Sequence, residues 1–478
     1  MYPNLSLYID GEWTQGSSGR TEPVINPATE EVLAELPHAS RADLDAALDA
    51  AQRGFKLWST KLPLERARIL KKIADLLRER SDDLGRVMTL EQGKTLAEAK
   101  MEVMMCAETF EWMAEEGKRV YGRIVPSRFG HNNRLMVVYE PAGPVAAFTP
   151  WNFPMLMPAR KLAAALAAGC SAIIKPSEET PGCTIALAQV CADAGLPAGV
   201  LNVVFGVPAE VSEYVIPHPA VRKVTFTGSI PVGKHLAALA AREMKKFTME
   251  LGGHAPVVIF DDVDVDKVAK MAAAGKFRNA GQVCVSPTRF YVHESIHDRF
   301  VQTFTDISKS LKIGNGLDES TQMGPLANPR RLDAMDDFVG DARERGATIQ
   351  TGGNRIGNQG FFFEPTVISE LDDDAKIMNQ EPFGPLAPVA RFSTLDEVIE
   401  RANRLPVGLA AYAFTGSNKR AMALSEGLEA GMVGVNSFNI AAPEAPFGGV
   451  KDSGMGREAG SEGLLEHFHV KMVSLTED

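Results

Sequence analysis

The hydrophobic positions near the start of the chain recur at helical spacing. In LERARILKKIADLLRER (64–80), apolar side chains return every three or four positions, and charged side chains lie between them. Residues 40–120 as a whole are rich in Ala, Leu, Glu, Lys and Arg. This part of the chain is therefore expected to be helical.

The pattern changes at residues 118–141, where two runs rich in β-forming residues flank the turn sequence Phe-Gly-His-Asn-Asn (129–133). A β-hairpin is the expected structure. Since an isolated hairpin is only marginally stable in water, we expect it to pack against another element, such as a second subunit.

From residue 143 short apolar runs alternate with helical segments. The expected strands lie at 143–150, 171–177, 201–206 and 221–229, and the expected helices at 158–169, between 177 and Gly195, and at 231–240. A second alternating set begins near residue 255, with a strand at 256–260, a helix at 264–277 and a strand at 289–292. This alternation predicts an α/β fold built from parallel β-α-β units, which bind ligands beyond the carboxyl ends of their strands.

Length and composition narrow the function classes. The 478 residues favour two or three domains, and the net charge of −11 argues against nucleic-acid binding, which needs basic patches. No C-x-x-C pair occurs, which indicates a reducing compartment without a disulfide framework or structural zinc. No signal-peptide pattern is evident, and no apolar run approaches the ~20 residues that cross a bilayer, so we expect a cytoplasmic protein without a membrane partner. The five cysteines are Cys106, Cys170, Cys183, Cys191 and Cys284.

One candidate catalytic signature is the sequence from His293 to His297, which fits H-E-x-x-H. That pattern binds zinc when both histidines lie on one helical face. Here an expected strand runs directly into His293, and Glu294 starts the next helix, so the two histidines would not share a face. A zinc hydrolase is therefore a remote alternative, and no metal site is expected.

Two further segments suit a dinucleotide cofactor. Gly228, Ser229 and Gly233 follow an expected strand and open a helix, whose N-terminus can hold a pyrophosphate; a plain strand-to-helix turn is the alternative. Lys175 and Glu178 end another expected strand and could hydrogen-bond ribose hydroxyls, unless they form an exposed loop pair. A carboxylate at the ribose would repel the extra phosphate of NADP, which favours NAD.

Cys284 lies in the flexible, polar stretch NAGQVCVSPT (279–288) and is the candidate nucleophile. A thiol nucleophile needs a base and a donor for the oxyanion. Glu250, which ends an expected strand before two glycines, could be the base, and Asn152 could donate its side-chain N–H. The alternative for Cys284 is a buried core residue, which is the commoner role of a free cysteine.

These residues belong to motifs that occur in the same order in the aldehyde dehydrogenase superfamily, which the chain resembles over essentially its whole length. Within it, succinate-semialdehyde and 2-oxoglutarate-semialdehyde dehydrogenases are the most similar. The motifs are PWNFP (150–154), IIKPSEETP (173–181), FTGS (226–229), MELGG (249–253), GQVC (281–284), EPFGP (381–385) and APFGGVKDSGMGRE (445–458).

The resemblance implies a Rossmann-like cofactor domain, an α/β catalytic domain and a β-hairpin oligomerisation element. It also implies a homodimer or homotetramer that acts on a small-molecule aldehyde. The expected ranges are 1–117 and 141–252 for the cofactor domain, 253–452 for the catalytic domain, and 118–140 and 468–478 for the oligomerisation element.

The same resemblance implies a role for each matching residue. Cys284, which must ionise, attacks the aldehyde carbon, and Asn152 with the backbone N–H of Cys284 holds the oxyanion of the thiohemiacetal. Hydride transfer to NAD, or alternatively NADP, leaves a thioester, and Glu250 activates the water that hydrolyses it. The expected cofactor-binding residues are Thr149, Pro150, Trp151, Lys175, Ser177, Glu178, Gly228, Ser229, Gly233, Leu251, Glu381 and Phe383.

Arg160 and Arg278 occupy positions at which succinate-semialdehyde dehydrogenases hold the distal carboxylate of the substrate. Arginine clamps a carboxylate through two parallel hydrogen bonds. Ala441 and Ala442 stand where that family usually has a serine, which favours a different acid. Succinic semialdehyde or a related semialdehyde is the predicted substrate, and a neutral aliphatic or aromatic aldehyde is the alternative. Ser286 replaces a second cysteine, so the redox switch of some members cannot form.

Overall fold

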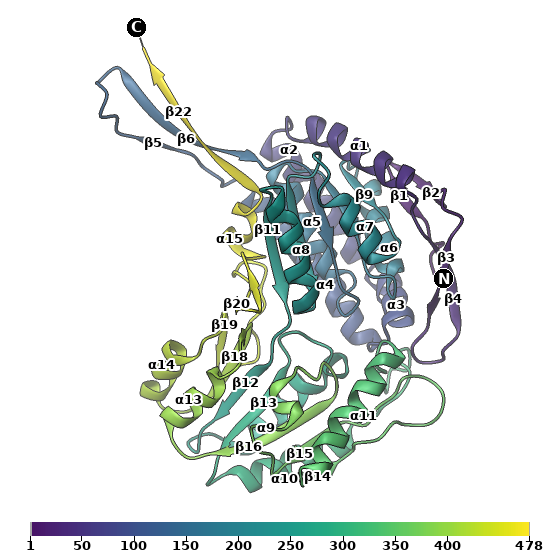
Figure 1. Cartoon of the computed structure of the whole chain (residues 1–478), viewed down its shortest axis with the longest axis vertical. Helices are drawn as coiled ribbons and strands as arrows, with labels where there is room; N and C mark the ends of the chain where they lie inside the picture. The colour runs from purple at the N-terminus through teal and green to yellow at the C-terminus, as the bar shows by residue number, and fades with distance from the viewer. Residues whose placement is uncertain (1, 478) are drawn as a thin grey trace.

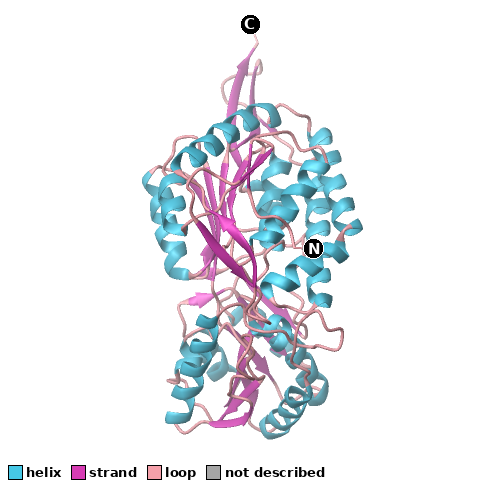
Figure 2. Cartoon of the chain, turned by 90° about the vertical axis from the view of Figure 1, so that its right-hand side faces the viewer, coloured by secondary structure: helices cyan, strands magenta, loops and turns pink. Residues whose placement is uncertain are grey.

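The computed structural model describes residues 2–477 as two α/β units stacked end to end, with a narrow three-stranded sheet projecting from one of them (Figure 1). Residues 1 and 478, the outer ends of two predicted ranges, lie outside the described residues. Helices cover both faces of the central strands in each unit (Figure 2). Within the described part, no helix has the length and apolar character needed to span a membrane.

The first unit is built on an eight-stranded sheet. Its five central strands are parallel, as the alternation of strands and helices predicted, whereas the strands at both edges are antiparallel. In spatial order the strands are β2 (Glu12–Thr14), β1 (Leu7–Ile9), β9 (Leu201–Val203), β8 (Ala172–Lys175), β7 (Val145–Phe148), β10 (Lys223–Gly228), β11 (Lys246–Leu251) and β21 (Gly454–Met455).

The helices of this unit follow from the patterns described above. Capping boxes start two of them, Ser40 with Asp43 and Thr95 with Glu98, so the side chains satisfy backbone N–H groups that the helix leaves free. The helices are α1 (Arg41–Trp58), α2 (Pro63–Glu79), α3 (Ser81–Gln92), α4 (Leu96–Glu116), α5 (Leu156–Ala168), α6 (Pro181–Asp193), α7 (Pro208–Val215), α8 (Ile230–Arg242) and α15 (Gly460–Leu465). A separate antiparallel ribbon joins β3 (Thr21–Ile25) to β4 (Val32–Pro37).

The second unit has its own hydrophobic core around a seven-stranded sheet, parallel except at one edge. The strand order is β14 (Thr348–Thr351), β15 (Thr366–Ser369), β16 (Leu386–Phe392), β13 (Pro287–His293), β12 (Ala255–Ile259), β18 (Ala410–Phe414) and β19 (Met432–Val435). The helices are α9 (Val265–Phe277), α10 (His297–Ser310), α11 (Pro329–Glu344), α12 (Lys376–Asn379), α13 (Leu395–Asn403) and α14 (Asn418–Gly427). A small ribbon pairs β17 (Val407–Gly408) with β20 (Val450–Lys451).

The predicted hairpin forms, and the end of the chain adds a third strand to it. β5 (Arg123–Val125) and β22 (Phe468–Thr476) flank β6 (Asn133–Pro141), and all three run antiparallel. Several apolar side chains of this sheet face solvent in the single chain, among them Ile124, Val470 and Met472. The sheet extends away from both cores (Figure 1).

The turn Arg278–Gly281 joins α9 to the segment that contains Cys284, and its backbone is left-handed from Asn279 onward. Asn279 and Ala280 have φ of 49° and 51°, and Gly281 has φ of 73°. A Cβ atom at Gly281 would lie 2.1 Å from the carbonyl oxygen of Gly384. Only glycine therefore fits at position 281, for reasons of both conformation and space.

We expect Gly281→Ala to lower the apparent melting temperature, because strained backbone of this kind costs ~1–3 kcal/mol before the steric overlap is added. Gly346→Ala is the matched control, since Gly346 also has positive φ (81°) but no atom within 4 Å of its added Cβ. Differential scanning fluorimetry of both variants compares them. Equal decreases in melting temperature for the two variants would mean that the close approach to Gly384 does not contribute to the loss of stability.

Candidate active site

Cys284 lies where two cavities meet between the two units. One cavity has a volume of about 270 Å³ and the other about 750 Å³, and Cys284 lines both. Glu250 and Asn152 line the smaller cavity, whereas Arg160 and Arg278 line the larger one. The residues predicted from the sequence to do chemistry therefore converge around one thiol.

The loop that carries Asn152 is clamped to the loop that carries Cys284. The side-chain amide of Asn152 donates to the carbonyl of Gln282 at 3.0 Å. In return, the Asn152 carbonyl accepts hydrogen bonds from the side chain of Asn279 at 3.0 Å and from Lys94 Nζ at 2.9 Å. The amide is consequently held beside the catalytic segment, where it has a second N–H to offer.

Lys94 and Glu102, which the sequence did not single out, support this clamp. They form a buried ion pair at 2.5 Å. The other carboxylate oxygen of Glu102 accepts from the backbone N–H groups of Met155 and Leu156, both at 3.0 Å, and so caps the start of α5. Since α5 carries Arg160, one buried carboxylate fixes both the Asn152 loop and an arginine of the larger cavity.

The surroundings of Cys284 do not by themselves favour the thiolate that the resemblance implied. Burial raises the pKa of the thiol to about 12, with the Glu381 carboxylate adding to the rise. Arg160 opposes that shift, whereas Glu250 adds to it. Additional positive charge, or transfer of the proton to a base, is needed to create the nucleophile.

Glu250 is 2% exposed, and neither of its carboxylate oxygens has a hydrogen-bond partner within residues 2–477. Burial raises its pKa well above the usual value, and the nearby Glu458 raises it further, whereas Lys161 lowers it. Burial and Glu458 therefore both favour the protonated form of Glu250 in the resting chain. A carboxyl group in this state can pass its proton on and act as a base once it has lost it.

Lys161 and Glu458 form a second buried ion pair, next to Glu250. Lys161 Nζ also donates to Thr227 Oγ1 at 2.7 Å and to Thr225 Oγ1 at 3.1 Å. This pair is not predicted from the sequence, although Glu458 ends the last of the shared motifs and Lys161 follows Arg160 directly. Nothing in the local pattern shows that two charged residues 297 positions apart meet in the core.

The smaller cavity has the shape and lining of a cofactor site. The rings of Trp151 and Phe383 meet edge to face there, with centroids 5.5 Å apart. Gly228 ends β10 opposite Leu251 in the neighbouring strand, and Ser229 follows it as the N-cap residue of α8. Burial raises the pKa of Glu381 to about 8. The predicted cofactor residues that line the cavity are Pro150, Trp151, Gly228, Ser229, Leu251, Glu381 and Phe383.

The other predicted cofactor residues lie outside this cavity. Lys175 and Glu178 pair at 2.6 Å at the carboxyl end of β8, and Ser177 donates to Glu179 nearby. Thr149 follows β7, and its hydroxyl is buried without a partner in the described chain. Gly233 has a packing role, because a Cβ there would lie 2.2 Å from the side chain of Leu251.

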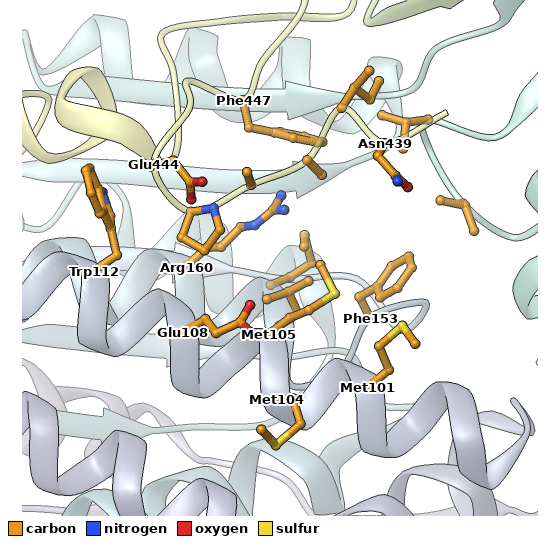
Figure 3. Close-up of a pocket in the computed structure, with 18 of the residues that line it drawn as sticks. Met101, Met104, Met105, Glu108, Trp112, Phe153, Arg160, Asn439, Glu444 and Phe447 are labelled. Atoms are coloured by element: carbon orange, nitrogen blue, oxygen red, sulfur yellow. The ribbon is translucent and has the colours of Figure 1, made fainter. Parts of the chain in front are cut away.

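The two arginines of the larger cavity are available to a ligand. Arg160 is 6% exposed, and its guanidinium carbon lies 4.3 Å from the centroid of the Phe447 ring. Figure 3 shows the two side chains extending toward each other. Arg278 lies 5.7 Å from the ring of Phe153. Neither guanidinium is in an ion pair or a side-chain hydrogen bond with any residue from 2 to 477. Arg160 is buried without an anionic partner, which is costly and points to an anion that arrives from outside, whereas Arg278 is exposed at the side of the cavity.

The H-E-x-x-H sequence divides between two elements, as expected. His293 ends β13 and His297 begins α10. His293 Nδ1 contacts Ser295 Oγ at 2.8 Å, and His297 Nδ1 contacts Asp298 at 3.1 Å. Across residues 2–477, no three His, Cys, Asp or Glu side chains are grouped in a way that could hold a metal ion.

Comparison with known proteins agrees with this arrangement. The aldehyde dehydrogenase family profile matches residues 13–473. A putative 4-(hydroxymethyl)benzenesulfonate dehydrogenase of Comamonas testosteroni is 47% identical, over 99% of this chain and 98% of its own. The NADP(+) succinate-semialdehyde dehydrogenase of Escherichia coli K12 is 43% identical, over 98% and 97%.

Among solved structures, a betaine aldehyde dehydrogenase from Staphylococcus aureus in complex with NAD+ is similar, with a TM-score of 0.96. It is 36% identical, and the match covers 99% of this chain and 97% of that one. The fold class and the family predicted from the ordered motifs are thereby confirmed, and with them the enzyme class. The chain belongs to the aldehyde dehydrogenase family.

Proposed function

We propose that this protein oxidises an aldehyde bearing a distal acid group to the corresponding carboxylic acid, through a thioester on Cys284. The observation that carries the proposal is the position of Cys284 between a cavity lined by the residues expected to hold a nicotinamide and a cavity lined by two arginines without ion-pair partners in the described chain. Succinic semialdehyde or a related semialdehyde is the proposed substrate, and the named succinate-semialdehyde relative supports it.

In the first step the Cys284 sulfur attacks the aldehyde carbon. The free N–H of the Asn152 amide and the backbone N–H of Cys284 stabilise the oxyanion, a contribution typically worth ~3–4 kcal/mol per donor. The aldehyde enters through the larger cavity, and its hydrogen faces the smaller one. The residues around the smaller cavity would hold an oxidised nicotinamide, which would supply the hydride acceptor and a positive charge near the thiol, whose pKa burial raises.

In the second step water hydrolyses the thioester. Glu250 lines the cavity on the cofactor side of Cys284 and is the base for this water. The buried Lys161–Glu458 pair lies beside it and sets how easily it loses its proton. Hydrolysis releases the carboxylic acid and restores the thiol.

The smaller cavity fits a nicotinamide cofactor. We assign Trp151, Phe383 and Glu381 to the nicotinamide half and the start of α8 to the pyrophosphate. Lys175 and Glu178, at the carboxyl edge of the same sheet, are the proposed adenosine-ribose contacts, with NAD as the favoured cofactor. On this proposal residues 1–117 and 141–252 bind the cofactor, and residues 253–452 supply the nucleophile.

The main test is NADH formation with succinic semialdehyde, 2-oxoglutaric semialdehyde, acetaldehyde and benzaldehyde. We expect kcat/KM for the acidic aldehydes to exceed that for acetaldehyde at least ~10-fold, because an arginine clamp adds charge-assisted hydrogen bonds. Arg160→Ala and Arg278→Ala should remove that lead, and Cys284→Ala should abolish turnover of every aldehyde.

Arg345→Ala is the matched control, since Arg345 pairs with Asp341 on the surface. If Cys284→Ala retained appreciable turnover, the nucleophile would be misassigned. A second contrary outcome is that neutral aldehydes match the acidic ones in kcat/KM, with both pocket arginine variants behaving like wild type. In that case Ala441 and Ala442 would indicate the substrate class better than the arginines do. The protein would then be an aldehyde dehydrogenase for neutral substrates.

The pH dependence of kcat tests whether the Lys161–Glu458 ion pair sets the pKa of Glu250. Glu458 raises the pKa of Glu250, so Glu458→Gln should lower that pKa, and the unpaired Lys161 acts in the same direction. Because activity needs deprotonated Glu250, the acidic limb of the kcat profile should move to lower pH. Glu462→Gln, an exposed change on α15, is the control. A limb that stays in place would show that the pair does not govern Glu250.

We also propose that the sheet β22-β6-β5 joins copies of the chain into a homodimer or homotetramer. Val470 and Met472 lie two residues apart on one face of β22 and are 66% and 63% exposed. The double change Val470→Asp and Met472→Asp should reduce the mass measured by light scattering towards that of one chain. Met422→Asp, at a residue 60% exposed on α14, should leave the mass unchanged. An unaltered mass in the double variant would place the interface elsewhere.

A further inference from the structure

The larger cavity is much roomier than a four-carbon semialdehyde needs. Its volume of about 750 Å³ lies in the range of sites that enclose drug-sized ligands, ~300–1,000 Å³. The helix α4 lies opposite Phe447 and contributes Met101, Met104 and Met105 to the lining; Met105 is half-buried, whereas Met101 and Met104 lie at the open rim and are 61% and 38% exposed (Figure 3). Methionine walls adapt to bulky apolar groups and make favourable contacts with aromatic rings.

The walls nearest Cys284 are also apolar and largely aromatic. Val283 and Val285 flank the thiol along the chain, and the rings of Phe153, Phe438 and Phe447 line the same cavity. Flat rings and β-branched side chains offer dispersion contacts and edge-to-face packing to a ring. They offer no hydrogen bonds to the hydroxyl or keto groups of a polar chain.

A second cavity of about 310 Å³ continues past Arg278. Arg278, Val283, Val285, Phe438 and Asn439 line both cavities, so Arg278 lies at their junction. The continuation adds polar groups that the main cavity lacks, from the side chains of Ser286, Ser437 and Tyr412. A charged group at the far end of a rigid ligand can therefore reach Arg278 and a polar surround.

The outer rim of the larger cavity is acidic, which limits the charge a ligand can carry. Glu111 and Glu115 are paired with basic side chains, namely Arg78 for the first and Lys71 and Lys118 for the second. Glu108 and Glu444 line the cavity without an ion-pair partner among the described residues. Their charges oppose the entry of a dianion more strongly than that of a monoanion.

We propose that, among the aldehydes with a distal acid group, the best substrate is an aromatic aldehyde that carries a single anionic group on the opposite side of the ring, and that succinic semialdehyde is accepted as the poorer substrate. The ring occupies the apolar chamber between α4 and Phe447, and the anion is held at the arginines. This inference rests on the proposed function, because it assigns the substrate class of the same site. Carboxylate and sulfonate share the recognition chemistry, and the test separates them.

The test compares kcat/KM of the wild-type enzyme for 4-formylbenzoate, 4-formylbenzenesulfonate, benzaldehyde and succinic semialdehyde, with NAD+ as oxidant. We expect at least one of the two anionic ring aldehydes to exceed benzaldehyde by ~10-fold or more, through the anion, and to exceed succinic semialdehyde by a similar factor, through the ring. The better of the two identifies the anion.

A chamber-filling variant checks that the ring binds in the larger cavity. Ala441→Phe narrows the cavity while keeping both arginines in the sequence, and it should reduce kcat/KM for the anionic ring aldehydes ~10-fold more than for succinic semialdehyde. Ala42→Phe, on an exposed position of α1, is the matched control. Should Ala441→Phe fail to fold, inhibition of the wild type by terephthalate, compared with succinate, replaces it, and terephthalate should bind ~10-fold more tightly.

The outcomes distinguish a wrong aromatic substrate assignment from a wrong proposed function. If succinic semialdehyde is oxidised as well as or better than both anionic ring aldehydes, the aromatic assignment is overturned and the proposed function stands. If benzaldehyde equals the anionic ring aldehydes, the anion has no role and the assignment is likewise overturned. If no aldehyde is oxidised, the proposed function itself fails.

Discussion

The active site depends on how one backbone carbonyl, that of Asn152, is held in the interior. Asn279 and Lys94 both donate to it, and the Asn152 side chain returns a hydrogen bond to Gln282, two residues before the nucleophile. Breaking any of these bonds would leave buried polar groups unsatisfied, which costs ~1–3 kcal/mol each and more where a charge is involved. The two loops are therefore locked together as one piece, and the oxyanion donor and the thiol keep a fixed relation.

The same network explains why this region tolerates strained backbone. Asn279 adopts a left-handed conformation, and its side chain accepts from Gln92 while donating to Asn152. The hydrogen bonds supply what the unfavourable φ costs. Because Gln92 and Lys94 come from the first unit and Asn279 from the second, the contact also joins the two units at the thiol.

Burial disfavours the charged forms of several ionisable groups in the site, and this helps reactions that move protons. It raises the pKa values of Cys284 and Glu381 and lowers that of Lys276, whose Nζ has no hydrogen-bond partner within residues 2–477, to about 7. Groups in this state change protonation easily when a charged ligand arrives. A core optimised for stability alone would pair or remove them.

The sequence predicts most of the fold and much of the candidate site, for a physical reason. Strand and helix periods, the glycine-bearing turns and the ordered motifs are local properties, and they correctly indicated the parallel sheets, the hairpin and the divided His293–His297 pair. The support of the site is not local. Glu102 lies among other charged residues of α4 and resembles part of a solvated helix face, yet it is 1% exposed and caps α5. Lys161 and Glu458 meet only because α5 and the segment before α15 pack on the same sheet.

The substrate class depends both on local sequence motifs and on contacts between residues that are distant in the sequence. Arg160 is recognisable from its place after PWNFP, but its meaning comes from the stack on Phe447 and from the lack of any anion beside it in the described chain. The contact with the Phe447 ring restricts the arginine side chain, so less side-chain entropy is lost when an oxyanion binds. The sequence shows a cation, whereas the structure shows a cation already oriented beside aromatic and methionine walls, and that combination selects for a ring as well as for a charge.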